Sequence, residues 1–537
     1  MSTEQFAAFV KWYEQRKKKM WDFDSELKAY CILDVEILNR AMASYMRFGK
    51  QLTNGLNPLC CPTIAGYAKK VYMTFHIPTQ RPDTNKSVLC VLTPEEDEFI
   101  RRSVYGGRVN VTNHLVELTD EMLKMGHSIQ YKDIISLYPY IQMVKPMPVG
   151  APRHYTHEQI RQFQQQKQLD NNAWLLQCGE GFVQIKMQLG EELYPPMPTK
   201  HQGRVNWTLL PIENNVYALP EVREAIRAGG VVTKIDYALL FDSSLDLWRK
   251  YISLFYEVKT LAGKRPKNIN AFCETARSRF GFDLDPSKFH ENPGLKNTGK
   301  NLLNSLWGKM MQRSFPQKKI CNNEQFDNLL QQHERKEIVI LSEEIVSDNQ
   351  TCVKFRSTVD DNLGDKNIAV ASYVTSWARL EIRSYMKRVG DHKILCDTDS
   401  VLYSAYKSPG ALHEEPWVAP GLQLGDMEDE KAGYLIYGAV SPANKLYALK
   451  CCHAGHELPE FCNKTMKTFA LSCLREPLFR IAALKNKILE YVDVTVQTIK
   501  CKGVSLKVAA NNEKLRFKIL KKNGLRQIAY RGKFAWA

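Results

Sequence analysis

The chain carries two aspartates between two short apolar runs, in ILCDTDSVLY at residues 394–403. The runs 393–396 and 401–406 are typical of strands, and the DTDS between them has hairpin-turn chemistry. Because side chains at i and i+2 of an extended chain face the same way, we expect Asp397 and Asp399 to point to one spot. Two carboxylates about 4 Å apart repel by roughly 4 kcal/mol at an effective dielectric near 20. The hairpin therefore requires either full solvation of both acids or a cation between them.

Composition indicates an intracellular protein with a polyanionic partner. The chain has 537 residues, 44% of them hydrophobic and 25% charged, which is ordinary for a globular protein of roughly two to four domains. Its net charge of +16 favours nucleic acid as the partner, with an acidic membrane surface as the second candidate. The N-terminus lacks a signal-peptide pattern, and no apolar run reaches membrane-spanning length. The 14 cysteines form no disulfide framework, so we expect reduced thiols inside a cell, without secretion and without a membrane partner.

One cysteine-rich stretch could bind a metal ion. CCHAGHELPEFC, from Cys451 to Cys462, holds cysteines and histidines close together in the chain. No paired C-x-x-C spacing frames them, which favours a polar surface loop and leaves a zinc site as the alternative.

Helical and strand-like segments alternate along the chain without an internal repeat. Residues 1–50 have apolar side chains at helical spacing, and a stretch with Gly, Pro and Asn at 53–63 indicates a linker. Further segments are strand-like at 181–189 and 231–241 and helical at 245–312 and 369–389. Residues 500–537 are strongly basic, which favours phosphate contact over the alternative of a solvated terminal helix.

A third acid, Asp133 in YKDIISLYPYIQM, follows a strand-like run at a point where the chain bends into a turn. Alone it is typical of a turn or cap residue. Together with Asp397 and Asp399 it can hold two magnesium ions roughly 3.5–4 Å apart. Such ions activate an attacking oxygen and stabilise the leaving oxygen in an in-line phosphoryl displacement. They would also remove the repulsion within the hairpin.

A cationic helix face is the next part of the pattern. In GLKNTGKNLLNSLWGKMMQR, Lys296, Lys300 and Asn304 stand at successive i, i+4 positions, with Gly308 one turn further. Two like-charged lysines on one face repel each other unless an anion neutralises them. A triphosphate along that face would do so, and two exposed lysines on a solvated helix are the alternative.

Three segments, in this order, resemble motifs A, B and C of family B DNA polymerases: DIISLYP, KNLLNSLWG and DTDS. KLY at 445–447 resembles the K-x-Y motif of that family, and KCKG at 500–503 resembles the lysine-glycine element near the start of its thumb. The spacing from Lys300 to Asp397 and the insertion around GFVQIKMQLGEELYPPMPTK are similar to those of the protein-primed branch. That branch includes polymerases of linear plasmids, some bacteriophages, adenoviruses and Polinton/Maverick-type elements.

The resemblance implies a role for each matching acid. Asp133, Asp397 and Asp399, with the backbone of Ile134, would hold two Mg²⁺ ions, with Mn²⁺ as an alternative. In the family the first and last acids carry most of the coordination, so Asp397 would contribute less. Tyr138 matches the tyrosine whose ring excludes a ribose 2′-hydroxyl.

Nucleotide and DNA contacts are implied in the same way. Lys296 and Lys300 match the phosphate-binding lysines, and Asn304 matches the residue beside the incoming nucleotide. Trp307 stands in place of the motif B tyrosine and keeps a flat stacking face without the hydroxyl. Contacts with DNA are implied at Gly106, Gly107, Lys445, Tyr447, Lys500 and Lys502. Two further departures from the family pattern are Leu395 and Val104, each at a position where tyrosine is usual.

The N-terminal segment resembles part of a 3′–5′ exonuclease. YCILD, with Tyr30 and Asp34, is similar to the third proofreading motif of that enzyme. The first two motifs, an acidic D-x-E and a later Asn/Asp pair, should lie upstream, where this sequence has no room for them. A two-metal nuclease cannot work with one carboxylate and a tyrosine, so we expect an N-terminally shortened polymerase without proofreading.

The resemblance implies an α+β fold, namely a right-hand polymerase with palm, fingers and thumb, and a remnant of an N-terminal exonuclease domain. The expected domains are the exonuclease remnant (1–50), a linker and template-contact element (51–110), the first part of the palm with motif A (111–150), an insertion resembling the first terminal-protein region (151–245), the fingers with motif B (246–312), an insertion resembling the second terminal-protein region (313–367), the second part of the palm with motif C and K-x-Y (368–499), and a basic thumb (500–537).

Three functions remain open from the sequence. The first is a template-dependent DNA polymerase that binds template-primer DNA, adds dNTPs to a 3′-hydroxyl and starts from a terminal priming protein. The second is a catalytically silent remnant that binds DNA or a terminal protein, and the third is a metal-dependent nuclease. Tyr138 and the two lysines of the helix face favour the first, because a nuclease has no use for a triphosphate site. A chain from an integrated element would be expected in the nucleus.

Overall fold

The computed structural model of the chain has two compact units, 1–75 and 76–537, and is α+β, as the sequence predicts. No helix in the ranges given below is long and apolar enough to cross a membrane. The residues that the structure describes are 3–17, 22–78, 88–201, 204–312, 317–335, 337–357, 366–453, 493–494, 498–501, 504–507, 515–522 and 525–531.

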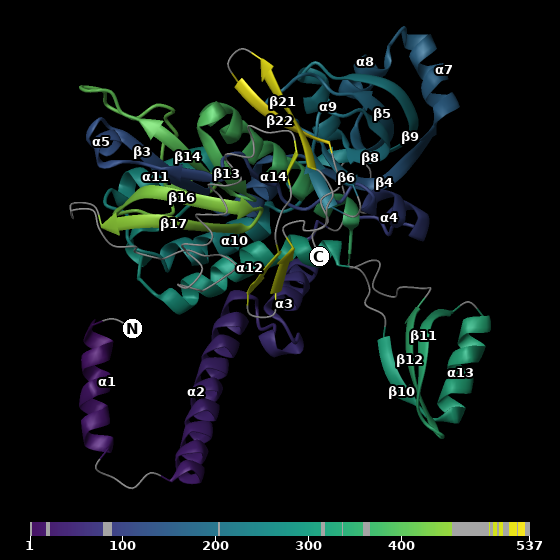
Figure 1. Cartoon of the computed structure of the whole chain (residues 1–537). Helices are drawn as coiled ribbons and strands as arrows, with labels where there is room; N and C mark the ends of the chain where they lie inside the picture. Colours follow the sequence, from purple (N-terminus) through teal and green to yellow (C-terminus); the bar gives the residue numbers. More distant parts are fainter. Residues whose placement is uncertain are drawn as a thin grey trace. The chain divides into compact units, whose positions relative to one another are not determined.

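The first unit is helical, with α1 (Thr3–Arg16), α2 (Phe23–Leu52) and α3 (Ile64–Val71) (Figure 1). This confirms the helical pattern of residues 1–50. The carboxylate of Asp22 accepts a hydrogen bond from the backbone of Ser25 and so caps α2. Much of α2 exposes apolar side chains, among them Leu27, Ile32, Leu33, Ile37 and Leu38.

An eight-stranded antiparallel sheet forms the centre of the second unit. Its main order is β1 (Val109–Val111), β13 (Lys393–Asp397), β14 (Ser400–Tyr406), β3 (His127–Ile134), β16 (Tyr434–Ala443) and β17 (Leu446–His453), with β15 (Met427–Asp429) on β3 and β2 (Leu115–Glu117) on β16 (Figure 1). The predicted hairpin of two strands joined by DTDS is therefore confirmed as β13 and β14. We refer to this sheet as the palm sheet.

Helix α14 (Ile368–Val389) packs against β13 and β14 of the palm sheet and confirms the helix predicted at 369–389. Its first turn is capped by Asn367, whose side-chain oxygen accepts hydrogen bonds from Ala369 and Val370. Nearly every residue of its first two turns is buried, because other elements cover it on several sides. These include α4 (Pro94–Arg101) and α6 (Leu137–Val144).

The predicted linker at 53–63 consists of turns and a 3₁₀ helix (Pro58–Cys60) between α2 and α3, whereas the rest of the 51–110 region, expected to hold a template-contact element, is largely helical. Helices α3 and α4 occupy much of it. Tyr67 and Ile100, one from each helix, are buried. Apolar side chains at helical spacing in this region pack into cores, which the turn-rich stretch at 53–63 does not reveal.

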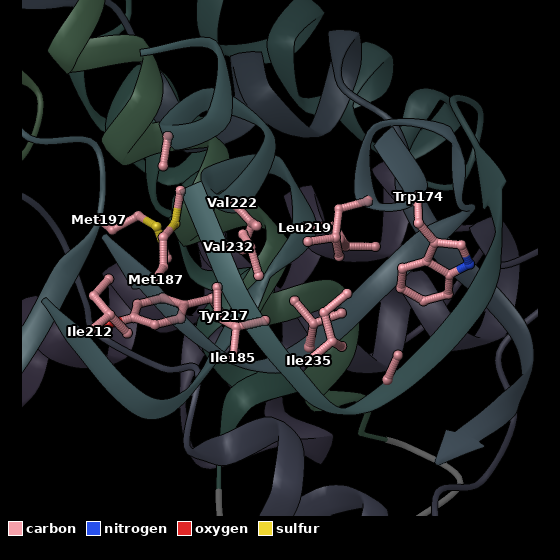
Figure 2. Packing of buried hydrophobic residues seen from close by; sticks show 14 of the residues in the cluster. Trp174, Ile185, Met187, Met197, Ile212, Tyr217, Leu219, Val222, Val232 and Ile235 are labelled. Carbon is pink, nitrogen blue, oxygen red and sulfur yellow. The ribbon is translucent and has the colours of Figure 1, made fainter. Parts of the chain in front are cut away.

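The 151–245 region, predicted to be an insertion, forms a compact core to which Tyr105 also contributes. It contains a four-stranded sheet in the order β4 (Met147–Thr156), β9 (Val231–Ser244), β5 (Glu180–Gln188) and β8 (Ile212–Ala218). Three helices belong to the same region: α7 (His157–Lys167), α8 (Asn171–Gln177) and α9 (Leu219–Arg227). A separate hairpin is formed by β6 (Pro198–His201) and β7 (Arg204–Trp207). Figure 2 shows side chains of β5, β8 and β9 interdigitating with Trp174, Leu219 and Val222 of the helices. Strands β5 and β9 confirm the two strand-like runs seen in the sequence.

Buried charges connect this insertion to α14. The guanidinium of Arg379 forms two hydrogen bonds, of 2.7 and 2.8 Å, to the carboxylate of Glu221 in α9, and both side chains are fully buried. One turn later, Arg383 forms ion pairs with Glu192 and Glu224. A buried ion pair is costly to separate, because each partner would be left as an unpaired charge away from water. The insertion is therefore fixed to the helix that supports the palm sheet.

Three helices follow the insertion, as the sequence predicts: α10 (Arg249–Leu261), α11 (Ile269–Phe280) and α12 (Pro293–Met311). Helices α10 and α12 pack closely together. The hydroxyl of Tyr251 donates a hydrogen bond to the carbonyl of Leu302, and a Cβ at Gly299 would lie only 3.0 Å from the backbone of Lys259. We refer to these three helices as the fingers helices.

The remaining elements form smaller groups. Strands β10 (Gln317–Cys321), β12 (Gln350–Ser357) and β11 (Ile338–Ser347) make a sheet that shares a small core with α13 (Asn323–Glu334). The basic C-terminal region contains strands rather than the terminal helix weighed as an alternative: β18 (Asp493–Val494), β19 (Thr498–Cys501), β20 (Val504–Lys507), β21 (Leu515–Lys522) and β22 (Leu525–Arg531).

The ion pair between α9 and α14 predicts a specific loss of stability. Glu221→Gln leaves the Arg379 guanidinium buried without its counter-charge, which should lower the free energy of unfolding by about 3 kcal/mol. Urea denaturation followed by circular dichroism measures this change. As a control, Glu213→Gln removes an exposed ion pair with Lys186 from the same insertion and should cost less than about 0.5 kcal/mol. Equal losses in the two variants would contradict the role given to the buried pair.

Candidate active site

The acidic hairpin is a tight turn rather than extended chain. Asp397 is the last residue of β13 and is only 2% exposed, whereas Thr398 and Asp399 form the turn. Thr398 has a left-handed backbone (φ +65°), and the backbone of Asp399 donates a 2.7 Å hydrogen bond to the carbonyl of Asp397. The two acids are therefore separated by a tight turn and not by the extended chain that the i, i+2 alternation assumed.

Strand register brings Asp133 to the same hairpin. Asp133 lies opposite Ser400 on β14, and Asp397 lies opposite Ser400 from the other side. The backbone of Ile134 donates a 2.8 Å hydrogen bond to the carbonyl of Asp399. The predicted acids thus meet at one end of three adjacent strands. A fourth acid, Glu428 on β15, stands directly opposite Asp133.

Lys445 already provides a cation at this cluster. It sits in the tight connection between β16 and β17 with a left-handed backbone (φ +64°), and its ammonium lies 2.5 Å from Oδ1 of Asp397. The sequence comparison had predicted only a DNA contact for this residue. Its ammonium offsets part of the repulsion expected for the acidic hairpin.

Tyr447, the other residue of the K-x-Y match, lies in the core of the palm sheet rather than at a surface that could face DNA. It is 2% exposed, and its hydroxyl shares a 2.7 Å hydrogen bond with the hydroxyl of Tyr131. The expected contact of this side chain with DNA is therefore corrected. Alternation along β17 explains the difference, because alternate side chains of a strand point into the core.

The donor set fits a hard divalent cation. Carboxylate oxygens and a backbone carbonyl are the ligands that Mg²⁺ prefers. A cation already lies against one of the acids in the form of the Lys445 ammonium. Within the ranges that the structure describes, no three Asp, Glu, His or Cys side chains are grouped closely enough to form a ready-made metal site. The acids are brought to one sheet end by their strands, and their side chains are not yet gathered around one point.

The lysine face predicted for motif B is present. Lys296, Lys300 and Asn304 all lie within α12, with both lysines exposed. Trp307, one turn further, contacts Tyr138 of α6, with ring centroids 4.4 Å apart and ring planes at 45°. Burial, with smaller contributions from the charges of Asp399 and Asp397, raises the pKa of Tyr138 to about 12. Its hydroxyl therefore stays neutral next to the acids at ordinary pH.

One lysine of the candidate site, Lys259, was not predicted from the sequence. The ammonium of Lys259, on α10, donates a 2.8 Å hydrogen bond to the hydroxyl of Ser136. Burial lowers the pKa of Lys259 to about 8, with further lowering from Lys300 and Lys296 and opposite effects from Glu428 and Asp133. Lys259 thus lies within electrostatic reach of both the acids and the α12 lysines.

A signal for this lysine was present in the sequence. Lys259 stands four residues after the buried Phe255 and seven after the buried Ile252, so it occupies a position on the apolar face of α10. A lysine at such a position is either paired or functional, because an isolated buried ammonium is costly. Ser136, the partner of Lys259, is unusual for a residue at the start of a helix. It precedes α6 with a left-handed backbone, and its hydroxyl bonds to Lys259 instead of capping the helix.

Of the two glycines predicted to contact the template, Gly107 lies against the acidic hairpin and Gly106 bonds to α14. Gly106 has φ +76°, and its carbonyl accepts a 2.6 Å hydrogen bond from Arg379. A Cβ at Gly107 would lie 2.9 Å from the side chain of Thr398, so only glycine fits without a shift. The next carbonyl, of Arg108, accepts a 2.7 Å hydrogen bond from the backbone of Thr398. This segment therefore supports the turn that carries the acids.

The other predicted site residues lie elsewhere. In the first unit Tyr30 and Asp34 are exposed on α2, and a hydrogen bond to Asp34 raises the pKa of the Tyr30 hydroxyl. Lys500 belongs to β19, and Lys502 is outside the described residues. Cys451 belongs to β17 and is buried, and Cys462 is outside the described residues, so the proposed zinc stretch begins in the palm sheet.

Solved structures similar to this chain include those of the Phi29 DNA polymerase. Its complex with single-stranded DNA has 16% sequence identity and a TM-score of 0.44, with 72% of this chain and 54% of that chain covered. Its ternary complex with primer-template DNA and incoming nucleotides has 15% identity and a TM-score of 0.48, with 88% and 67% covered. The chain thus spans about half of the length of the first of these. At such scores the likeness supports no conclusion by itself.

Comparison with curated proteins found no match. The family described as "DNA polymerase type B, organellar and viral" matches residues 3–391, which include Asp133, the fingers helices and α14. The match extends over more than half of the sequence and ends just before the acidic hairpin. The chain belongs to the organellar and viral type B DNA polymerase family.

Proposed function

We propose that the chain is a template-dependent DNA polymerase of the protein-primed type, which adds dNTPs to a 3′-hydroxyl. One observation carries this proposal. Lys259 donates a 2.8 Å hydrogen bond to Ser136, three residues after Asp133. Its backbone packs closely against Gly299, next to Lys300 of α12, so the lysines of the fingers helices adjoin the strand that carries Asp133. A nucleotide whose triphosphate lies along the lysines would present its α-phosphate toward the carboxylates. Family membership supports the same reaction class.

In the proposed reaction, the acids would bind metal ions and the lysines would bind the triphosphate. Asp133, Asp397 and Asp399 with the carbonyl of Ile134 are the groups that would hold divalent ions, two Mg²⁺ in the proposed mechanism. Such ions supply Lewis-acid activation of a hydroxyl and neutralise charge on the phosphates. The lysines of α10 and α12 bind and orient the triphosphate, since positioning and electrostatic stabilisation account for most of the catalysis of phosphoryl transfer.

Two further groups act on the sugar and on the primer. The ring of Tyr138, held by Trp307, lies near Asp399 and so near the sugar of a nucleotide bound between acids and lysines. Lys445 contacts Asp397 and Thr398, but its side chain is more than half exposed, so it can also contact a primer phosphate. The terminal priming protein is the partner proposed for the first nucleotide, through the resemblance of the 151–245 insertion to the first terminal-protein region.

A catalytically silent remnant is the less favoured reading. The three acids, the two α12 lysines and a third lysine in the fingers helices stand together around one sheet end. A protein that only holds DNA would need the positive charges and would gain nothing from the acids, which repel phosphate.

Primer extension tests the proposed function. With a labelled template-primer, Mg²⁺ and dNTPs, the parental chain should extend the primer, and Asp399→Asn should lower the rate by about 10³-fold, since a metal-binding carboxylate supports several kcal/mol of transition-state stabilisation. Affinity for template-primer should stay nearly unchanged, because phosphate contacts supply most of it. Asp391→Asn, an exposed acid just before the same hairpin, is the matched control. Extension by Asp399→Asn at the parental rate would refute the assignment of the acids.

Sugar discrimination tests the role of Tyr138. Tyr138→Ala removes the ring that would collide with a 2′-hydroxyl, so the preference for dNTP over rNTP should fall by about 10²-fold. The ratio of kcat/KM values for dATP and ATP measures this preference. Tyr138→Phe keeps the ring and should retain the parental ratio. A parental ratio in Tyr138→Ala would remove the residue from this role.

A pH profile tests Lys259. Its pKa of about 8 means that the ammonium is lost as pH rises through that value, and a triphosphate then loses one cationic partner. We expect kcat/KM for dNTP to fall above about pH 8, since this ratio reports the ionisation of the free enzyme. Lys259→Arg keeps the charge and should shift the fall to higher pH. An identical profile in Lys259→Arg would assign the fall to another group.

A further inference from the structure

A short segment between β14 and β15 joins the fingers helices to the strand that carries Asp133. On the palm side it pairs with Ile135, two residues after Asp133. The backbone of Ile135 donates a 2.9 Å hydrogen bond to the carbonyl of Asp426, and Gly425 donates a 3.0 Å hydrogen bond to the carbonyl of Ile135. Segment 423–426 is thus fixed to the backbone that leads out of the acid cluster.

On the other side, the same segment contacts two of the fingers helices. The buried side chain of Gln423 donates a 2.8 Å hydrogen bond to the carbonyl of Phe272 in α11 and accepts a 3.1 Å hydrogen bond from the hydroxyl of Tyr256 in α10. Asp426 accepts a 2.6 Å hydrogen bond from the guanidinium of Arg279, near the end of α11. Both helices are therefore connected to the palm sheet through four consecutive residues.

The conformation of this segment leaves little room for change. Gly425 has φ +83°, and a Cβ there would lie 2.3 Å from the ring of Tyr140. The second carboxylate oxygen of Asp426 accepts a 2.9 Å hydrogen bond from the backbone of Gln423, which closes the segment on itself. Because this segment cannot easily change its shape, a displacement of the fingers helices is passed on to the backbone of Ile135.

We propose that segment 423–426, through the Arg279–Asp426 ion pair, positions the lysine-bearing helices relative to the acids and thereby sets the affinity for the incoming nucleotide. This inference rests on the proposed polymerase function. The ion pair reaches these helices through the end of α11, because the carbonyl of Phe280, next to Arg279, accepts a 3.3 Å hydrogen bond from the guanidinium of Arg249 on α10. On α10, Tyr256 lies one turn before Lys259, and α10 packs on α12, which carries Lys296 and Lys300. A shift of these helices away from Ile135 changes the gap that a triphosphate must span. Arg279 and Asp426 are positioning residues, since neither reaches the acids or the lysine face.

The Arg279–Asp426 ion pair is the contact of this segment that can be altered without unfolding the core. Arg279 is 39% exposed and Asp426 is 20% exposed, whereas Gln423 is fully enclosed between helices. Truncation of Arg279 therefore weakens the connection at its surface end and leaves the buried hydrogen bonds of Gln423 in place.

The first test separates nucleotide affinity from turnover. In steady-state primer extension, Arg279→Met should raise KM for dNTP about fivefold and leave kcat within about twofold, as expected for loss of one partly exposed ion pair that acts on binding. Arg279→Lys should recover most of the affinity, because it retains the charge. Arg277→Met is the matched control, since its ion pair with Asp283 stays within α11 and the loop that follows.

A double variant tests whether the two residues act as one. Asp426→Asn keeps an acceptor for the backbone of Gln423 but removes the charge that faces Arg279. If the two residues act on nucleotide affinity through one ion pair, Arg279→Met and Asp426→Asn together should raise KM for dNTP no further than either substitution alone. Additive increases would mean that the residues act separately and would overturn the proposal.

Binding without turnover distinguishes failure of this inference from failure of the proposed function. Fluorescence anisotropy of a labelled dATP with template-primer and Ca²⁺ gives Kd for the nucleotide directly. A Kd about fivefold weaker in Arg279→Met supports the inference even if the parental chain does not extend primers, in which case only the proposed function fails. A Kd unchanged from the parental value, or no binding by either chain, overturns the inference.

Discussion

The strand register that brings carboxylates to one end of the palm sheet is the constraint on which the rest of the structure depends. Antiparallel register places Asp133 and Asp397 on opposite sides of Ser400, and the turn adds Asp399. A cluster of this kind persists only where cations are close, and Lys445 supplies one to Asp397. Lys259 lies within reach of Asp133 from the fingers helices. The arrangement of acids and lysines thus follows from charge balance as much as from packing.

Local patterns in the sequence were enough to predict the parts of the site that are local in the fold. The hairpin around DTDS, the lysine face of α12 and the helix α14 each depend on spacing within about twenty residues. The tight turn between Asp397 and Asp399 could not be predicted in this way, because Thr398 adopts a left-handed backbone that contacts Gly107 and Arg108, far away in the sequence. Burial of Tyr447 depends likewise on its distant partner Tyr131.

Features that arise from contacts between distant segments were missed. The position of Lys259 on the apolar face of α10 indicates a paired lysine, but its partners, Ser136 and the charges on α12 and β15, lie far away in the sequence. The same holds for segment 423–426, whose partners lie on α10, α11 and the end of β3. Helix α3 was missed for a different reason, since the turn-forming residues at 53–63, which connect α2 to α3, are the stronger local pattern.

The ion pairs between α14 and the 151–245 insertion have a consequence for how such a protein changes over time. Arg379 and Arg383 project from a palm helix into acids that belong to the insertion, and Arg379 also holds the carbonyl of Gly106. Loss of residues 151–245 alone would leave the guanidinium groups of Arg379 and Arg383 without these carboxylate partners. Residues 151–245 and α14 are therefore expected to change together, since an uncharged residue at either arginine position would leave acids of this region without their partners.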